Sequence, residues 1–424
     1  MHFNKELFSH SADNFNQFLR WLALSTIVGL VVGLISILFN FGMKNATQLR
    51  EDNPWILLFL PVAGIIIVAL YRFFNYESNG GTDTVIECIQ TETYIPLEMA
   101  FLIFVSAILT VFCGGSVGRE GAAVQIGGSI GKSVGDWLYF DKKDRRILLM
   151  SGISAAFSAL FSTPMAAAFL PMEMADVGFL YYPALVPCIW ASFVAYFLAR
   201  AMHAPAEQLI VTQNVELTLP LALLVVLLGI LCALVSILFC EALYVSHSLY
   251  KTYLKNSYVR IVTGGLLIIG LTLLLGTNAY LGPGMDVIEQ FLEGHVIPWA
   301  FLLKILFTAI TIGAGYKGGE IVPSFFTGAA FGALFGSLFG ANIPLCAAIG
   351  MVSVFCGVTN CPVTALLIGF ELFGFAHAPC YLIAIAVSYM LSGHYSLYHA
   401  QRILYPKVER VRQDPKTTLH KSSK

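Results

Sequence analysis

Two charged, glycine-rich segments interrupt the long apolar runs of this chain. Residues 114–121 read GGSVGREG and contain Glu120, while residues 315–323 read GYKGGEIVP and contain Glu320. An ionisable residue at membrane depth is costly, so its default interpretation is functional. Paired interruptions in corresponding places of two halves indicate an inverted-repeat transporter with a substrate site near the membrane midplane. The sequence therefore predicts a protein that moves an ion.

The composition is that of a polytopic membrane protein. Of 424 residues, 57% are hydrophobic and 12% are charged, and the mean hydropathy is +0.77. Soluble domains carry about 25% charged residues. Several apolar stretches are shorter than the roughly 20 residues that cross a bilayer. We therefore expect broken or re-entrant helices beside regular ones, with the lipid bilayer as the surroundings and no nucleic-acid partner.

The two halves of the chain show the same order of signals. Each contains a glycine-rich break, a helix with small residues at helical spacing, and a proline-led helix with a glutamate nine residues after the proline. Those glutamates are Glu173 and Glu371, and we expect them to pair with backbone or side-chain groups rather than carry protons. The predicted segments are a cytoplasmic N-terminal segment (1–17), a first membrane repeat (18–205), a second membrane repeat (206–405) and a basic C-terminal tail (406–424).

The breaks have the chemistry of an anion site. A helix that begins inside the bilayer presents unpaired N–H groups and a partial positive charge at its N-terminus. Glycines before the helix let the backbone approach a ligand closely. An ionised glutamate at such a place can occupy the anion position, and a protonated one can leave it. Competition for one position would couple proton movement to anion movement.

The motifs resemble those of the CLC family of anion channels and proton-coupled anion transporters. Residues 118–121 resemble the family's Gly-Lys/Arg-Glu-Gly-Pro motif, and residues 318–323 resemble Gly-Gly-x-Phe-x-Pro. The resemblance covers about residues 20–405. It implies an all-α membrane protein with two inverted-topology repeats of tilted and broken helices. It also implies a homodimer, with one complete pathway in each subunit.

The resemblance assigns roles to individual residues. Glu120 corresponds to the gating glutamate, and Tyr398 to the central tyrosine whose hydroxyl faces the anion, with Tyr395 as the competing alignment. Glu120 and Glu320 are the expected gating and proton-coupling pair. The expected anion-binding residues are Gly80, Gly81, Gly118, Arg119, Gly121, Gly319, Ile321, Val322 and Tyr398.

The departures from the family pattern favour its fluoride-exporting CLC-F branch. Gly80 or Gly81 stands where other members have an anion-binding serine, and Glu320 occupies the usually apolar place in the second motif. Val322 replaces the threonine usual in that branch. Met174 stands where chloride/proton exchangers have an internal glutamate, so Glu320 would be the inward proton acceptor. The resemblance thus implies a proton-coupled anion antiporter that exports fluoride in exchange for H⁺.

Other interpretations remain open at this stage. The chain could be a chloride or nitrate/proton exchanger or a passive CLC anion channel, and Glu320 could instead form an ion pair with Lys317. The G-x-S-x-G pattern around Ser116 fits a serine hydrolase, but we expect no enzyme activity. We also expect no cofactor and no metal site. A bacterial inner membrane is the expected location.

Overall fold

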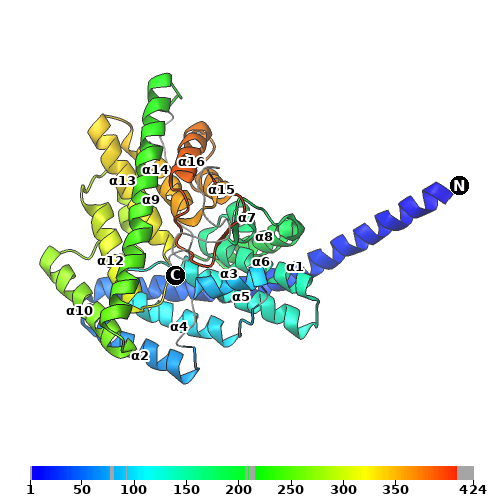
Figure 1. The fold of residues 1–424 in the computed structure, drawn as a ribbon, viewed down its shortest axis with the longest axis horizontal. Coiled ribbons are helices and arrows are strands. Elements are labelled where there is room, and N and C mark those ends of the chain that lie inside the picture. The colour runs from blue at the N-terminus through cyan, green and yellow to red at the C-terminus, as the bar shows by residue number, and fades with distance from the viewer. Residues whose placement is uncertain (1, 77–80, 92, 206–208, 210–214, 408–424) are drawn as a thin grey trace.

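The computed structural model describes residues 2–76, 81–91, 93–205, 209 and 215–407, with side chains from residue 13 onward. The expected repeat boundary at residue 206 and residues 408–424 of the expected tail lie outside this range. α1 (His2–Asp52) continues without a break past residue 18, the expected start of the first repeat. Its N-terminal end extends well beyond the rest of the molecule (Figure 1).

The described part of each half contains eight α-helices in the same order. The first half continues with α2 (Leu60–Phe73), α3 (Thr82–Thr91), α4 (Glu98–Phe112), α5 (Glu120–Trp137), α6 (Lys142–Phe161), α7 (Pro164–Glu173) and α8 (Leu185–Ala201). The second half contains α9 (Leu219–Tyr253), α10 (Ser257–Leu275), α11 (Met285–Leu292), α12 (Ala300–Ala314), α13 (Ile321–Phe339), α14 (Ile343–Thr359), α15 (Pro362–Phe373) and α16 (Ala378–Leu391). Two 3-10 helices are Pro54–Phe59 and Tyr182–Ala184.

Helices of membrane-spanning length occur beside shorter ones, as the sequence predicted. In the described residues, six helical segments are long and apolar enough to cross a bilayer, and five apolar helices are shorter. The short two-residue strands β1 (Asp176–Val177) and β2 (Arg402–Ile403) form a parallel pair. This pair attaches the segment after α16 to the end of α7. The fold is otherwise helical, which confirms the predicted class.

Small residues allow the two central helices to pack closely on their neighbours. α5 packs against α6, and α13 packs against α14. A side chain at Gly127 would collide with the carbonyl of Gly152, and one at Gly328 would collide with the carbonyl of Gly350. Small residues permit such close approach between helices in membranes. The small residues at helical spacing that follow each break therefore serve close helix packing.

The proline-led helices α7 and α15 cap each other. Neither helix has a side-chain cap from its own N-cap residue. The carboxylate of Glu371 in α15 accepts hydrogen bonds from the N–H groups of Met165 (2.8 Å) and Ala166 (2.9 Å) in α7. In return, Glu173 in α7 accepts from Val363 N (2.9 Å), Thr364 N (2.9 Å) and Thr364 Oγ1 (2.7 Å). Both glutamates therefore pair with backbone groups, as expected.

Candidate functional site

The two glycine-rich breaks lie directly against each other. Gly118 N donates to Gly319 O (2.7 Å), and Gly319 N donates to Gly118 O (2.8 Å), forming an isolated antiparallel bridge. α5 begins two residues after Gly118, and α13 begins two residues after Gly319. Segments two hundred residues apart in the sequence thus place two helix N-termini at one point. The backbone N–H groups of both first turns are available there for an anionic partner.

Glu120 supplies an anionic group at this point. Its side chain is fully buried, and Oε2 accepts a hydrogen bond from Val322 N (3.1 Å) in the first turn of α13. The glutamate of the first break therefore interacts with the helix that follows the second break. This carboxylate oxygen therefore occupies a helix N-terminus, which is a position that can bind a free anion.

Arg119 lies beside this carboxylate, but its guanidinium donates a hydrogen bond to a different residue. Its Nε is 4.0 Å from Glu120 Oε1, whereas its Nη1 donates to Asn40 Oδ1 at 2.6 Å. The guanidinium also lies over the ring of Phe161, 5.2 Å from the ring centre. Asn40 in turn donates to Pro205 O (2.9 Å). Arg119 thus links the first break to α1 and α6.

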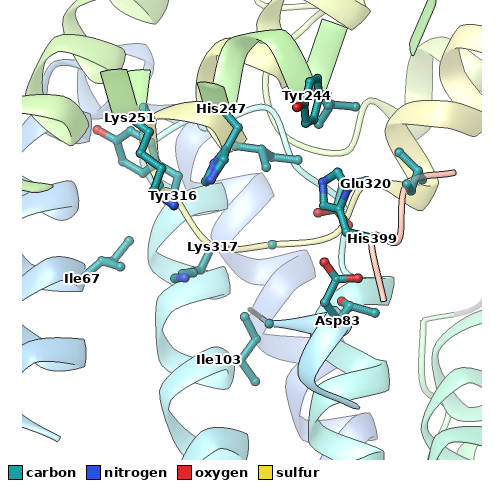
Figure 2. Close-up of a pocket in the computed structure, with 18 of the residues that line it drawn as sticks. Ile67, Asp83, Ile103, Tyr244, His247, Lys251, Tyr316, Lys317, Glu320 and His399 are labelled. Atoms are coloured by element: carbon teal, nitrogen blue, oxygen red, sulfur yellow. The ribbon is translucent and has the colours of Figure 1, made fainter. Parts of the chain in front are cut away.

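Glu320 lines a large cavity, whereas Glu120 does not. The cavity has a volume of about 640 Å³ and is lined by residues of α2, α3, α9 and α10 and by residues 315–318 and 320 of the second break. Figure 2 shows the side chains of Glu320, Asp83 and His399 around one part of it. Its other ionisable lining residues are Tyr71, Cys240, Tyr244, His247, Lys251, Arg260, Tyr316 and Lys317. Of the two glutamates, Glu320 is therefore the one that faces this cavity.

The sequence left open an ion pair between Lys317 and Glu320, and the described residues do not form it. The ammonium group of Lys317 instead lies over the ring of Tyr71, 4.5 Å from the ring centre. Glu320 is the N-cap residue of α13 and makes no side-chain capping bond. Its carboxylate is thus not held by the first turn of its own helix.

Tyr398 and Tyr395 differ in their burial and in their relation to the two glutamates. Its side chain is buried, and it lies within electrostatic range of Glu120 and Glu320. Tyr395, the competing alignment, is half-buried, and its carbonyl accepts a hydrogen bond from Asn360 (3.1 Å). These positions favour Tyr398 as the tyrosine nearest the junction of the breaks.

A buried hydrogen-bond network holds the tyrosine segment, and sequence reasoning missed it. Ser396 Oγ accepts from Tyr398 N (3.0 Å) and donates to Gln401 Oε1 (2.8 Å). Gln401 Nε2 then donates to the carbonyls of Met174 (3.0 Å) and Thr359 (2.9 Å). Met174, which stands where the resemblance places an internal glutamate, thus helps to position this segment through its backbone carbonyl.

The remaining expected anion-binding residues lie around the same junction. Gly81 has a left-handed backbone (φ +62°) and lines the cavity, while a side chain at Gly121 would come within 2.9 Å of Gly319 Cα. Ile321 and Val322 are buried in the first turn of α13. Gly80 lies outside the described residues. The structure thus brings the described members of the set together.

Asp83 is a cavity residue that the sequence did not single out. It lies in the first turn of α3, and its Oδ1 accepts a hydrogen bond from Ala400 N (3.0 Å). Asp83 also lies close enough to Glu320 for their charges to interact. A signal was present, because Asp83 lies two residues after Gly81 in the segment that replaces the serine motif. Its hydrogen-bond partner, however, is more than three hundred residues away in the sequence.

The hydrolase pattern around Ser116 has a structural explanation. Ser116 is fully buried, and its Oγ lies 3.2 Å from Thr308 Oγ1, while its N–H donates to Thr311 Oγ1 (3.2 Å). These contacts attach the first break to α12. The serine is bonded to threonines and not to a histidine.

Fold and site together define a polytopic helical membrane protein whose two halves each contribute a broken helix to one central point. Residues 63–393 match the family model described as voltage gated chloride channel. The chain belongs to this CLC family.

Individual relatives agree with this assignment. The chain is 35% identical over 398 residues to a chloride/fluoride channel protein of Pseudomonas syringae pv. tomato, covering 92% of this chain and 88% of the relative. It is 27% identical over 405 residues to an H(+)/Cl(-) exchange transporter of Vibrio vulnificus, covering 85% of each chain.

Two solved structures have the same fold. A crystal structure of a CLC-type fluoride/proton antiporter matches with a TM-score of 0.87 and 32% identity, covering 90% of this chain and 98% of that one. A slow cyanobacterial Cl-/H+ antiporter matches with a TM-score of 0.75 and 20% identity, covering 88% and 94%. The second likeness concerns the fold alone. The predicted CLC-type architecture is confirmed.

Proposed function

We propose that this protein is a proton-coupled anion antiporter that exports fluoride in exchange for H⁺. The observation that carries the proposal is the hydrogen bond from Val322 N to the buried carboxylate of Glu120. It places an ionisable group where a helix N-terminus would otherwise bind a free anion. The relatives support the same function, because one is named a chloride/fluoride channel protein and one solved neighbour is a fluoride/proton antiporter.

The mechanism follows from competition at the start of α13. While ionised, the Glu120 carboxylate holds the N–H of Val322 and excludes an anion from it. On protonation the carboxyl loses its charge, so its attraction to the helix N-terminus weakens. The side chain then leaves, and fluoride takes the same N–H group. When the carboxyl group then gives up its proton, the carboxylate returns to this N–H and expels the fluoride.

Glu320 serves the proton side of the cycle. It adjoins Ile321 at the same helix start, yet it lines the cavity that Glu120 does not reach. Protons therefore pass between Glu120 and the cavity through Glu320, which replaces the internal glutamate missing at Met174. An inward proton gradient then provides the energy for fluoride export.

The anion is held by backbone groups and a tyrosine hydroxyl. Val322 provides no side-chain hydroxyl where the fluoride branch usually has threonine, so the donors are the N–H groups of the first turn of α13 and the hydroxyl of Tyr398. Backbone N–H groups bind an anion without a full positive charge and allow its release.

The likeness to the family also supports a location and an oligomeric state. We infer that the protein lies in the bacterial inner membrane and forms a homodimer.

The test uses purified protein in liposomes. We expect fluoride efflux to exceed chloride efflux and a fluoride gradient to drive protons in the opposite direction. Equal chloride-driven proton movement would indicate a chloride/proton exchanger. A reversal potential that does not respond to pH would indicate a passive channel.

Glu120→Gln tests the coupling mechanism directly. The amide can still accept a hydrogen bond from Val322, but it cannot ionise, so fluoride-driven proton movement should fall to the level of empty liposomes. Glu87→Gln is the matched control, because Glu87 is an exposed glutamate of α3. Unchanged proton movement in Glu120→Gln would contradict the mechanism.

A further inference from the structure

The cavity that Glu320 faces has a basic end, to which the transport cycle above gives no role. His247 and Lys251 lie four residues apart in α9, so they share one face of that helix. Arg260 lies in the first turn of α10, and Lys317 lies in the second break. All four residues line the cavity, and His247 is within electrostatic range of the other three. Three separate segments thus bring cations to one part of the cavity.

The cations of the basic end have no carboxylate partner within the described part of the chain. No ion pair joins Lys251, Arg260 or Lys317 to another described residue. Lys317 has its ammonium group over the ring of Tyr71, and Arg260 Nε donates to Ala314 O (3.3 Å). An ammonium group and a guanidinium each carry several N–H donors. Most of these donors therefore remain for water or for an anion in the cavity.

The carboxylates of the cavity lie at its other end. Figure 2 shows Lys251, His247 and Lys317 on one side of the cavity, and Glu320 and Asp83 on the other. Lys317 is within electrostatic range of both Arg260 and Glu320, so it lies between the two ends. An anion is repelled by carboxylates and attracted by cations. The basic end is therefore the part of the cavity that suits an anion.

The basic end adjoins the segment that leads to the junction of the breaks. Lys317 precedes Gly318, which also lines the cavity, and Gly319 forms the paired hydrogen bonds with Gly118. The first turn of α13 follows directly in the same segment. With a volume of about 640 Å³, the cavity has room for an anion with its hydration water. An anion at Lys317 would thus lie next to the segment that ends at the central site.

We propose that the basic end binds the transported anion before it reaches the junction of the breaks. Lys251 is exposed and forms the outer part of this site, while Arg260 and Lys317 are half-buried. A cleft lined by one sign of charge raises the local concentration and the association rate of the opposite ion. Binding by charge alone is weak enough to let the ion move on. This inference rests on the proposed function, because it names where the transported anion first binds.

Removal and restoration of the charge at Lys251 tests the proposal. The assay is exchange of radioactive fluoride in liposomes with equal fluoride on both sides, so that the orientation of the protein does not matter. A charged cleft raises association rates about 10- to 1,000-fold, and an equal share for each of three cations is roughly two- to tenfold. We therefore expect Lys251→Cys to slow exchange about two- to tenfold at low fluoride and to leave the rate at saturating fluoride unchanged.

Chemical modification separates the charge from the shape of the side chain. A methanethiosulfonate reagent that attaches an ammonium group should restore exchange in Lys251→Cys, whereas one that attaches a sulfonate should slow it further. Both are applied before reconstitution. The nine native cysteines are buried, so the wild-type protein is the control for the reagents. Lys255→Cys is the matched control for position, because Lys255 is exposed just after α9 and does not line the cavity.

The inner cations are tested by Lys317→Met and Arg260→Gln. Both should also slow exchange at low fluoride more than at saturating fluoride. The difference should shrink at high ionic strength, because salt screens the attraction. A loss of the same size at every fluoride concentration would indicate a structural role for these two residues and contradict the proposal.

The remaining outcomes separate this inference from the proposed function. Equal slowing in Lys251→Cys and Lys255→Cys, or equal recovery with both reagents, would overturn the inference while leaving the proposed function intact. If the wild-type protein exchanges chloride but not fluoride, the proposed fluoride export is wrong, and chloride exchange in the same variants then decides the inference. Absence of both fluxes in the wild-type protein would contradict the two together.

Discussion

The reciprocal caps of α7 and α15 predict a large and specific loss of stability. In Glu371→Ala, the N–H groups of Met165 and Ala166 lose their acceptors. Each buried N–H left without a partner costs about 1–3 kcal/mol. Since Glu371 is partly exposed and water can replace part of the loss, we expect a decrease of about 2–4 kcal/mol in the free energy of unfolding.

Matched variants separate the stability lost with the capping hydrogen bonds from the stability lost with the negative charge. Glu371→Gln keeps one acceptor oxygen, so it should lose about half as much. Glu173→Ala should lose more than Glu371→Ala, because Glu173 accepts three hydrogen bonds and is 6% exposed. The double alanine variant should lose less than the sum, since both caps join the same two helices. Glu173→Gln should retain proton-coupled transport if Glu173 is only a cap.

Equilibrium unfolding in mixed detergent micelles, followed by tryptophan fluorescence, measures these differences. The control is Glu87→Ala on the exposed side of α3, which should change stability by no more than about 0.5 kcal/mol. If Glu371→Ala unfolds like Glu87→Ala, the caps do not stabilise the joint between the two halves. The reasoning from unsatisfied N–H groups would then be refuted.

Four further outcomes are expected. Gly328→Ala should destabilise by about 1–3 kcal/mol, because the new methyl group collides with the backbone of α14; Gly270→Ala, which meets open space, should instead gain about 0.5–1 kcal/mol. Glu320→Gln should slow transport or change the ratio of protons to fluoride ions measured in liposomes, and an unchanged ratio would assign Glu320 a structural role. Ser116→Ala should keep full transport activity, whereas complete loss of function would revive the hydrolase interpretation.

Much of the architecture could be predicted because membranes restrict where charge and glycine occur. The glycine-rich breaks, the short helices and the small-residue faces of α5 and α13 all follow from local sequence. The equal spacing from each proline to Glu173 and Glu371 also indicated two equivalent helices. Such features depend on residues close together in the chain, so a single sequence contains the necessary information.

Contacts between the halves could not be predicted in the same way. Three sets of hydrogen bonds join residues about two hundred or more positions apart. They are the bond from Val322 to Glu120, the reciprocal caps of α7 and α15, and the bond from Ala400 to Asp83. They depend on how the complete fold closes, which local spacing does not determine. The network around Gln401 was missed for the same reason, because an isolated glutamine near the end of a chain has no distinguishing pattern.

The paired backbone hydrogen bonds between Gly118 and Gly319 limit how this protein can change shape. Separation of the two halves at their centre would take the partners from two donors and two acceptors on these buried glycines, at a cost of about 1–3 kcal/mol for each buried group. Rigid-body rocking of one half against the other is therefore disfavoured at this place. We therefore expect the two halves to stay joined at this place while individual side chains change their rotamers.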